Sequence, residues 1–122
     1  MKSITHTYAV QALNSIRNVQ MKEHEKYSKD YGRLCISFPS MVQVNGLRLT
    51  VAFFQSKSVK EPCHADFIND LGKALDTDLF SDLPSGVTEY GKLTKHSLDA
   101  AVWFKRYAEA ILKVDAAEMA ED

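Results

Sequence analysis

Most hydrophobic residues of this chain recur at steps of three and four, the spacing that places side chains on one face of an α-helix. The first such stripe predicts a helix over about residues 6–27 and consists of Ile4, Tyr8, Ala12, Leu13, Ile16 and Val19. The same spacing continues to Phe38, where Pro39 interrupts it. Proline lacks a backbone N–H and disfavours helix at the preceding residue. Either one helix ends there and another begins, or one helix kinks.

A second group of apolar residues follows the pair Asn45-Gly46, where Gly46 is suited to a left-handed helix C-cap. The helix expected from Leu47 is apolar on more than one face, so we predict that it is the central helix of the core. A polar connection over residues 56–62 and a helix over residues 64–80 come next. Proline and glycine make residues 80–92 a predicted loop, and the last long helix is expected from about Thr94.

No stretch alternates strictly enough to predict a β-strand. The sequence therefore predicts an all-α fold, a single-domain antiparallel bundle of five to six helices over residues 1–114. Residues 115–122 are acidic and lack an apolar stripe, so we expect a disordered tail.

Composition narrows the class of protein only slightly. The 122 residues are 45% hydrophobic and 25% charged, as in soluble globular domains. No apolar run approaches the roughly 20 residues of a membrane span, and the first residues lack the apolar core of a signal peptide. We expect a cytoplasmic protein. Cys35 and Cys63 fit no zinc-binding spacing and are expected to be small buried side chains.

Charge is distributed unevenly along the chain. Residues 1–63 contain nine Lys and Arg against four Asp and Glu, whereas residues 64–122 contain six against twelve. The net charges of these halves are therefore +5 and −6. Such asymmetry is typical of a nucleic-acid-binding face, and it is equally compatible with head-to-tail contacts between copies of one protein.

The sequence contains no recognisable catalytic constellation. Neither HExxH, nor GxSxG, nor a phosphate-binding glycine loop is present. Cys63 and His64 are adjacent, and neighbouring side chains at a helix start diverge, which disfavours a nucleophilic pair. Asp66 and Asp70 share a helix face, but no third ligand follows at a matching step, so a solvated face is the better interpretation than a metal site. We predict no enzyme activity, no cofactor and no metal.

Basic residues give the more promising candidate surface. Lys26, Lys29 and Arg33 keep helical spacing, with Tyr27 and Tyr31 between them. Basic grooves with occasional aromatic residues track nucleic-acid backbones. The candidate RNA-binding residues are Lys26, Lys29, Arg33, Arg48, Lys57, Lys105 and Arg106. The alternative is that these side chains cover apolar surface while their charged ends remain in water.

Two segments carry a family resemblance. They are FPSMVQVNGLRLTVAFFQSK, residues 38–57, and LTKHSLDAAVWFKRYAEAILK, residues 93–113, which contains the single tryptophan. In this order and at this separation they resemble the small all-helical subunit of the Cmr complex, the RNA-guided, RNA-targeting effector of type III-B CRISPR–Cas systems. The resemblance extends over roughly residues 5–113. Its matching positions are Phe38-Pro39-Ser40, Asn45-Gly46-Leu47, Ala52-Phe53, Leu93-Thr94, Leu98, Ala101, Trp103, Lys105-Arg106 and Ala108-Glu109-Ala110.

The resemblance implies a non-catalytic structural subunit in antiviral defence. Its implied partners are other Cmr subunits, further copies of itself, and guide and target RNA contacted through their backbones, with no membrane. Copies would stack into a short filament lining the channel where target RNA pairs with the guide, and other subunits would cut the target. Trp103 is expected to fill the core. The competing hypothesis is a helical protein-binding adaptor or regulator with no RNA role; a small nuclease is disfavoured because no residues converge on a cleavage site.

Overall fold

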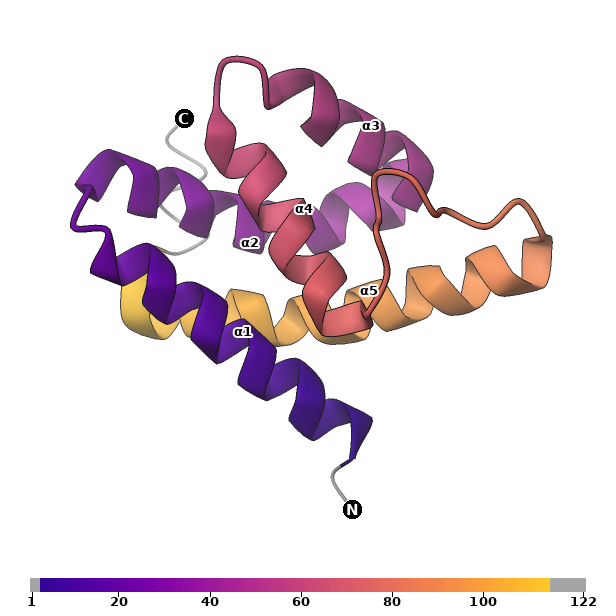
Figure 1. Cartoon of the computed structure of the whole chain (residues 1–122), viewed down its shortest axis with the longest axis horizontal. Coiled ribbons are helices and arrows are strands. Elements are labelled where there is room, and N and C mark those ends of the chain that lie inside the picture. The colour runs from indigo at the N-terminus through magenta and orange to yellow at the C-terminus, as the bar shows by residue number, and fades with distance from the viewer. Residues whose placement is uncertain (1–2, 115–122) are drawn as a thin grey trace.

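The computed structural model describes residues 3–114 as a bundle of helices (Figure 1). Its elements are α1 (Ile4–Met21), α2 (Glu25–Asn45), α3 (Leu47–Lys57), α4 (Pro62–Leu75), α5 (Val87–Tyr107) and the π-helix η1 (Ala108–Leu112). Within this range there is no strand, so the predicted all-α fold is confirmed. The predicted disordered tail, residues 115–122, lies outside the described residues.

α5 forms the long base of the bundle and packs against α1, α2 and α4, whereas α3 packs mainly on α2 and α4 (Figure 1). An aromatic cluster joins these helices at the centre. The ring of Phe67 on α4 lies between 5.2 and 5.9 Å, centroid to centroid, from the rings of Tyr31, Phe38, Phe54 and Phe104. One fully buried side chain therefore contacts α2, α3 and α5 at once.

The boundary between the first two helices differs from the prediction. α1 ends at Met21 because Glu23 has a left-handed backbone, with φ of 52°. His24 then caps α2, and its Nδ1 accepts a hydrogen bond from the Tyr27 N–H at 3.1 Å. A single helix continues through Pro39, which answers the question that the sequence left open.

The predicted helix end at Gly46 is confirmed. Gly46 has φ of 85°, a conformation that favours glycine, and its N–H donates to the carbonyl of Val42 at 2.8 Å. The prediction that α3 is the central helix is wrong. Leu47 and Phe54 are buried, but Leu49 is 65% exposed and Phe53 is 43% exposed. α3 is apolar on two faces, and only one of them meets the core.

Two other predicted boundaries are corrected. α4 ends at Leu75 and not at residue 80, because Asp76 adopts a left-handed conformation and Thr77 donates back to the carbonyl of Gly72. A Cβ at Gly72 would lie 2.5 Å from the Thr77 oxygen, so the reversal requires glycine there. α5 begins at Val87, about two turns before Thr94, and includes Gly91.

Trp103 does not fill the core as expected. Its ring is half-buried, packs beside Tyr107 and lies 5.0 Å below the guanidinium of Arg106. The neighbouring Phe104 is fully buried and takes the core position. Consecutive helix residues are about 100° apart around the axis, so the two aromatic rings cannot share one depth.

Candidate nucleic-acid interface

Three candidate RNA-binding residues, Lys26, Lys29 and Arg33, lie along the first half of α2; we call them the basic stripe. Asp30 lies among them. Its carboxylate is 2.7 Å from the Lys26 ammonium and 3.5 Å from the Arg33 guanidinium. The hydrogen bond to Asp30 raises the pKa of Lys26. The stripe with Asp30 therefore has a net charge of +2.

The end of η1 packs onto α2 beside this stripe. Lys29 Nζ donates a hydrogen bond to the carbonyl oxygen of Lys113 at 3.0 Å. Val114 is 1% exposed, and its Cγ2 atom lies 2.6 Å from where a Cβ of Gly32 would stand. The absence of a side chain at Gly32 lets the chain cross α2 at this point.

Lys105 and Arg106 lie in the last turn of α5. Both are exposed. Figure 1 shows that this end of α5 lies by the first half of α2, and η1, which follows it, packs on α2. The structure thus brings five of the seven candidate residues to one end of the bundle.

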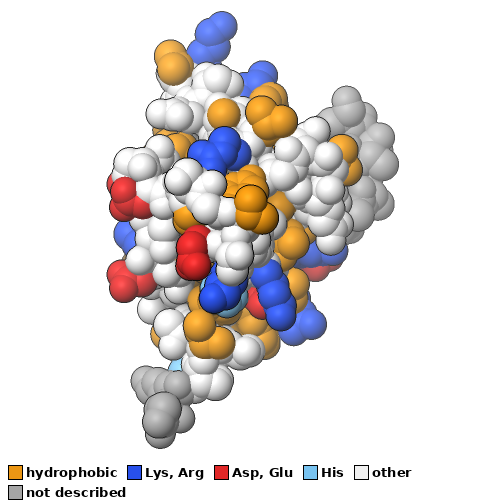
Figure 2. All heavy atoms as spheres, turned by 90° about the vertical axis from the view of Figure 1, so that its right-hand side faces the viewer, with side chains coloured by type: hydrophobic (Ala, Val, Ile, Leu, Met, Phe, Trp, Pro, Cys, Tyr) orange, Lys and Arg blue, Asp and Glu red, His pale blue; other side chains and the backbone are white. Residues whose placement is uncertain are grey.

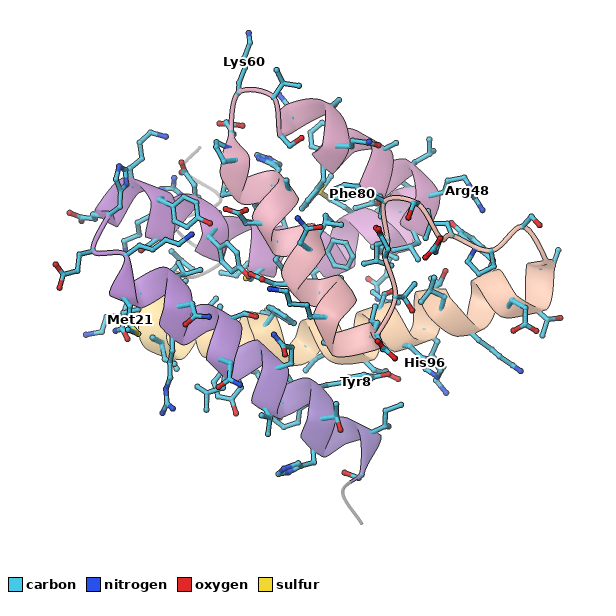
Figure 3. All side chains as sticks on the ribbon, in the orientation of Figure 1. Tyr8, Met21, Arg48, Lys60, Phe80 and His96 are labelled. Carbon is cyan, nitrogen blue, oxygen red and sulfur yellow. The ribbon has the colours of Figure 1, made fainter. Side chains whose placement is uncertain are left out.

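The remaining two candidates, Arg48 and Lys57, lie on α3. Figure 3 places Arg48 far from Met21, which marks the junction of α1 and α2. The Arg48 guanidinium donates to the Pro84 carbonyl at 2.8 Å and lies 5.1 Å from the Tyr90 ring. The Lys57 ammonium lies 5.6 Å from the ring of Phe53. The seven residues therefore form no single surface, and Arg48 holds the loop before α5.

Tyr27 and Tyr31 do not accompany the basic stripe; they turn toward α4. The Tyr27 hydroxyl donates to Asp66, and the Tyr31 hydroxyl donates to Asp70 at 2.6 Å. Both aspartates are half-buried, so the predicted solvated face of α4 is wrong at these positions. The sequence offered one signal, since the two tyrosines are four residues apart, as are the two aspartates, and each tyrosine is 39 residues from its aspartate.

Burial shapes the electrostatics of this contact. It raises the pKa of the Tyr31 hydroxyl and also the pKa of the Asp70 carboxyl. Burial likewise raises the pKa of Cys63 to about 11. The sulfur of Cys63 lies 3.8 Å from Nδ1 of His64. A thiol with this raised pKa stays protonated at neutral pH, whereas a nucleophile needs the thiolate.

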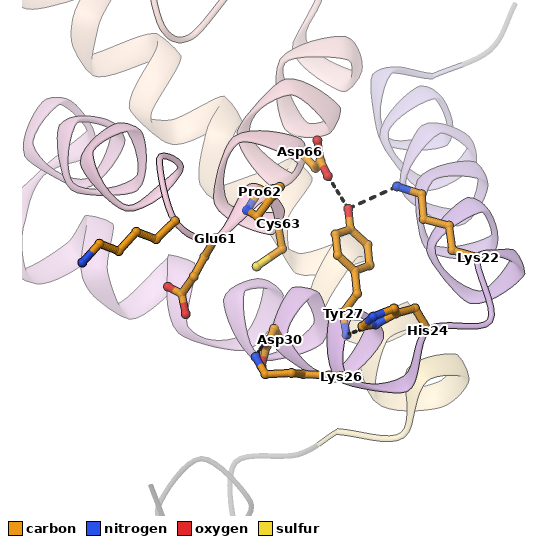
Figure 4. A pocket seen from close by; sticks show the side chains of 10 residues that line it. Lys22, His24, Lys26, Tyr27, Asp30, Glu61, Pro62, Cys63 and Asp66 are labelled. Carbon is orange, nitrogen blue, oxygen red and sulfur yellow. Dashed lines mark hydrogen bonds and ion pairs between the residues drawn. The ribbon is translucent and has the colours of Figure 1, made fainter.

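A pocket of about 600 Å³ opens between the α1–α2 junction and the start of α4 (Figure 4). Its lining consists of Lys22, His24, Lys26, Tyr27, Asp30, Lys60, Glu61, Pro62, Cys63 and Asp66. Three ammonium groups face three carboxylates, so the pocket has no dominant charge. Across residues 3–114 no cluster of three His, Cys, Asp or Glu side chains is arranged to hold a metal. In the same range, no helix is long and apolar enough to cross a membrane.

These features define a class: a small helical-bundle protein in which tyrosine–aspartate pairs join α2 to α4 and five of the seven candidate basic residues lie toward one end. The model of the family described as CRISPR-associated protein (Cas_Cmr5) matches residues 4–111, and the chain belongs to this family. The predicted resemblance to the Cmr small subunit is thereby confirmed.

A curated relative and a solved structure agree with this assignment. The chain is 27% identical over 118 residues to the CRISPR system Cmr subunit Cmr5 of Thermus thermophilus, covering 93% of this chain and 99% of the relative. The crystal structure of a CRISPR-associated Cmr5 family protein from the same organism matches with a TM-score of 0.77 and 25% identity. That match covers 90% of this chain and 98% of the solved one.

Proposed function

We propose that this protein is a non-catalytic structural subunit of the type III-B Cmr effector, and that its copies stack into a short filament lining the channel for guide and target RNA. Membership of the Cmr5 family supports a place in the Cmr complex. The observation that carries the RNA role is the gathering of the basic stripe, Lys105 and Arg106 at one end of the bundle. Asp66 and Asp70, which the sequence offered as possible metal ligands, accept hydrogen bonds from Tyr27 and Tyr31 and so join α4 to α2.

The proposed RNA contacts are ionic and independent of sequence. Base pairing with the guide selects the target, so the protein needs only charge and shape to hold the paired backbones. Each copy offers a few phosphate contacts, which makes binding by one isolated subunit weak and steeply salt-dependent. Stacked copies present many such contacts in a row, which raises the effective concentration of each next contact.

The proposed self-association has an apolar surface available to it. Leu49 and Phe53 lie one helical turn apart on the outer face of α3, and Val44 at the end of α2 is 80% exposed. Figure 2 shows hydrophobic side chains among Lys and Arg on the face that includes the α2–α3 turn and the start of α5. Exposed apolar side chains rimmed by polar ones are typical of protein contact surfaces.

The RNA role is tested in reconstituted Cmr complexes. Reversing charge with Lys105→Glu and Arg106→Glu should reduce retention of target RNA, most strongly at low salt, without lowering the thermal stability of the subunit. The matched control is Lys92→Glu with Lys95→Glu, two exposed residues of the same helix outside the proposed surface. Equal retention by both double variants across a salt series would place the RNA contacts elsewhere, on the basic stripe first.

The non-catalytic role is tested with the isolated protein. Purified material should not cleave RNA, with or without divalent metal ions, because the thiol of Cys63 is held protonated and the described histidines do not converge on carboxylate clusters. Robust cleavage that His24→Ala or His64→Ala abolishes would contradict this part of the proposal and restore the nuclease hypothesis.

A further inference from the structure

A hollow of about 420 Å³ opens between the start of α1 and α5, and we call it the α1–α5 pocket. Ile4 and Tyr8 line it from α1, whereas Val102 and Trp103 line it from α5. Figure 3 shows Tyr8 and His96, which also lines the pocket, close together where α1 passes α5. The volume is within the range of roughly 300–1,000 Å³ that is typical of small-ligand pockets.

The apolar part of this lining is left partly in solvent by the fold. Ile4 is 60% exposed and Val102 is 39% exposed, although both side chains are apolar. The indole ring of Trp103 is half-buried. An aromatic side chain that is partly exposed can stack on a nucleobase, and this stacking accepts any base because every base has a flat π-face.

Two polar side chains add hydrogen-bonding groups to the pocket. Tyr8 is only 4% exposed, and among the described residues its hydroxyl has no hydrogen-bond partner. Burial raises the pKa of this hydroxyl, so it stays protonated and able to donate at neutral pH. Asp99 is exposed on α5 and lines the same pocket, where its carboxylate is an acceptor. The pair therefore suits a flat ligand with both N–H groups and acceptors on its edge.

Trp103 connects the pocket to the basic residues at the end of α5. The guanidinium of Arg106 lies 5.0 Å from the centre of the indole ring. A nucleotide combines a flat, uncharged base with an anionic phosphate. An aromatic wall beside an arginine therefore matches both of its parts.

We propose that the α1–α5 pocket binds an unpaired nucleotide of single-stranded RNA, with the base stacked on Trp103 beside Arg106 and its Watson–Crick edge hydrogen-bonded to Asp99 and Tyr8. In a duplex that edge is already paired, so the pocket distinguishes unpaired from paired RNA. The choice of RNA as the ligand rests on the proposed function, which needs only contacts with the backbones of paired strands. The pocket adds selection for a nucleotide outside the paired region.

Stacking is tested by fluorescence of the isolated protein at low salt, because Trp103 is the single tryptophan of the chain. The probes are a single-stranded RNA, the same strand annealed to its complement, and the same strand without bases. The single strand should quench the fluorescence, since a stacked base quenches an excited indole. The duplex and the base-free strand should bind without quenching, with binding measured by anisotropy of a dye on the RNA. Free N-acetyltryptophanamide corrects for light that the RNA absorbs.

Asp99→Asn separates hydrogen bonding from overall charge. Removing a negative charge favours RNA binding by general electrostatics. The pocket predicts the opposite: affinity for the single strand should fall about fivefold or more, because a charged acceptor is lost. Glu109→Gln is the matched control, since Glu109 is exposed in η1 and does not line the pocket, and it should keep or slightly raise the affinity. Tyr8→Phe should give a smaller loss than Asp99→Asn.

Three results would overturn the pocket. One is binding of the single strand without quenching, and another is equal quenching by all three probes. The third is a gain of affinity in Asp99→Asn that equals the gain in Glu109→Gln, because charge alone would then govern binding. Each of these results leaves the RNA role of the subunit standing.

Further outcomes separate the pocket from the proposed function. No response to any probe overturns the pocket alone, since the proposed function places strong binding in the assembled stack. Quenching by the single strand alone supports the pocket; if Lys105→Glu with Arg106→Glu then leaves target RNA retention unchanged, the phosphate contacts of that pair are contradicted. Because Lys95 also lines the pocket, Lys92→Glu alone is the control for that pair once quenching is observed.

Discussion

The two halves of α2 are held in the bundle by different chemistry. The second half packs apolar side chains, with Phe38 completely buried and in ring contact with Phe54 and Phe67. The first half uses directed polar contacts, in which the hydroxyls of Tyr27 and Tyr31 donate to carboxylates of α4. Apolar packing tolerates small shifts, whereas a hydroxyl–carboxylate pair requires one register.

The contacts of the two halves set the rotation of α2 in the bundle, and that rotation decides which way its basic residues face. Each half buries one aromatic ring completely, Tyr31 in the first and Phe38 in the second, and such a ring contributes about 1.5–3 kcal/mol by transfer from water. The polar half fixes the rotation of α2 against α4, with both tyrosines turned inward. The basic stripe then has to face away from α4, toward η1 and solvent.

The largest expected effect is in the apolar half. Phe38→Ala should lower the free energy of unfolding by about 3–5 kcal/mol, because it leaves a cavity beside the aromatic rings of the core. Chemical denaturation measures this change. The control is Val44→Ala, at an exposed position of the same helix, which should stay within about 0.5 kcal/mol. A loss below about 1 kcal/mol for Phe38→Ala would show that α2 is not anchored by this cluster.

A smaller loss is expected in the polar half. Tyr31→Phe keeps the buried ring but leaves the half-buried carboxylate of Asp70 without its donor, which should cost about 1.5–3 kcal/mol. Tyr27→Phe is the comparison variant and should cost less, because its ring is less buried and water can replace the lost hydroxyl. Equal losses of stability for Tyr31→Phe and Tyr27→Phe would show that the burial of the tyrosine does not set how much its hydrogen bond to aspartate contributes.

Trp103→Ala tests whether the size of an aromatic ring or its burial decides how much stability is lost when the ring is removed. A fully buried tryptophan would cost about 3–5 kcal/mol, but this ring is half-buried and stacked under Arg106, so we expect about 1–2 kcal/mol. Denaturant unfolding beside the Phe38→Ala variant gives the comparison. A loss as large as that of Phe38→Ala would mean that α5 is anchored through its outer face.

The apolar half of α2 was predictable from the sequence and the polar half was not. Three- and four-residue spacing marks Phe38 and Phe67 as inward-facing, and Gly46 marks a helix end by its own backbone freedom. The partner of Tyr31 lies 39 residues away, on a helix whose rotation is set by packing. Spacing alone allows a solvated aspartate equally well, so the same pattern gave the wrong interpretation of α4.

The candidate RNA-binding residues show the same contrast between what local spacing predicts and what it does not. Helical spacing correctly grouped the basic stripe on one side of α2. Arg48 looked equivalent to the others in sequence, but its guanidinium meets Pro84 and Tyr90, which are 36 and 42 residues further along the chain. Contacts between distant segments follow from the folded path, and no local pattern encodes them.

The smallest expected effect is a pH dependence that belongs to the polar half alone. Burial raises the pKa of Asp70 above its ordinary value in the folded protein, so the folded state holds a proton there more tightly than the unfolded chain does. This group therefore adds stability as pH falls from neutrality toward the unfolded pKa, and that contribution is lost as pH rises through the folded pKa.

Asp70→Asn isolates this contribution, because its amide oxygen still accepts from Tyr31 and does not titrate. The difference in unfolding free energy, wild type minus Asp70→Asn, should grow in favour of wild type between about pH 7 and pH 4. Urea unfolding at several pH values measures it. Tyr31→Phe should steepen the trend, since the lost hydrogen bond is one that lowers the pKa of Asp70. A flat or reversed difference would mean that solvent, and not the α2–α4 contact, sets the titration of this carboxyl.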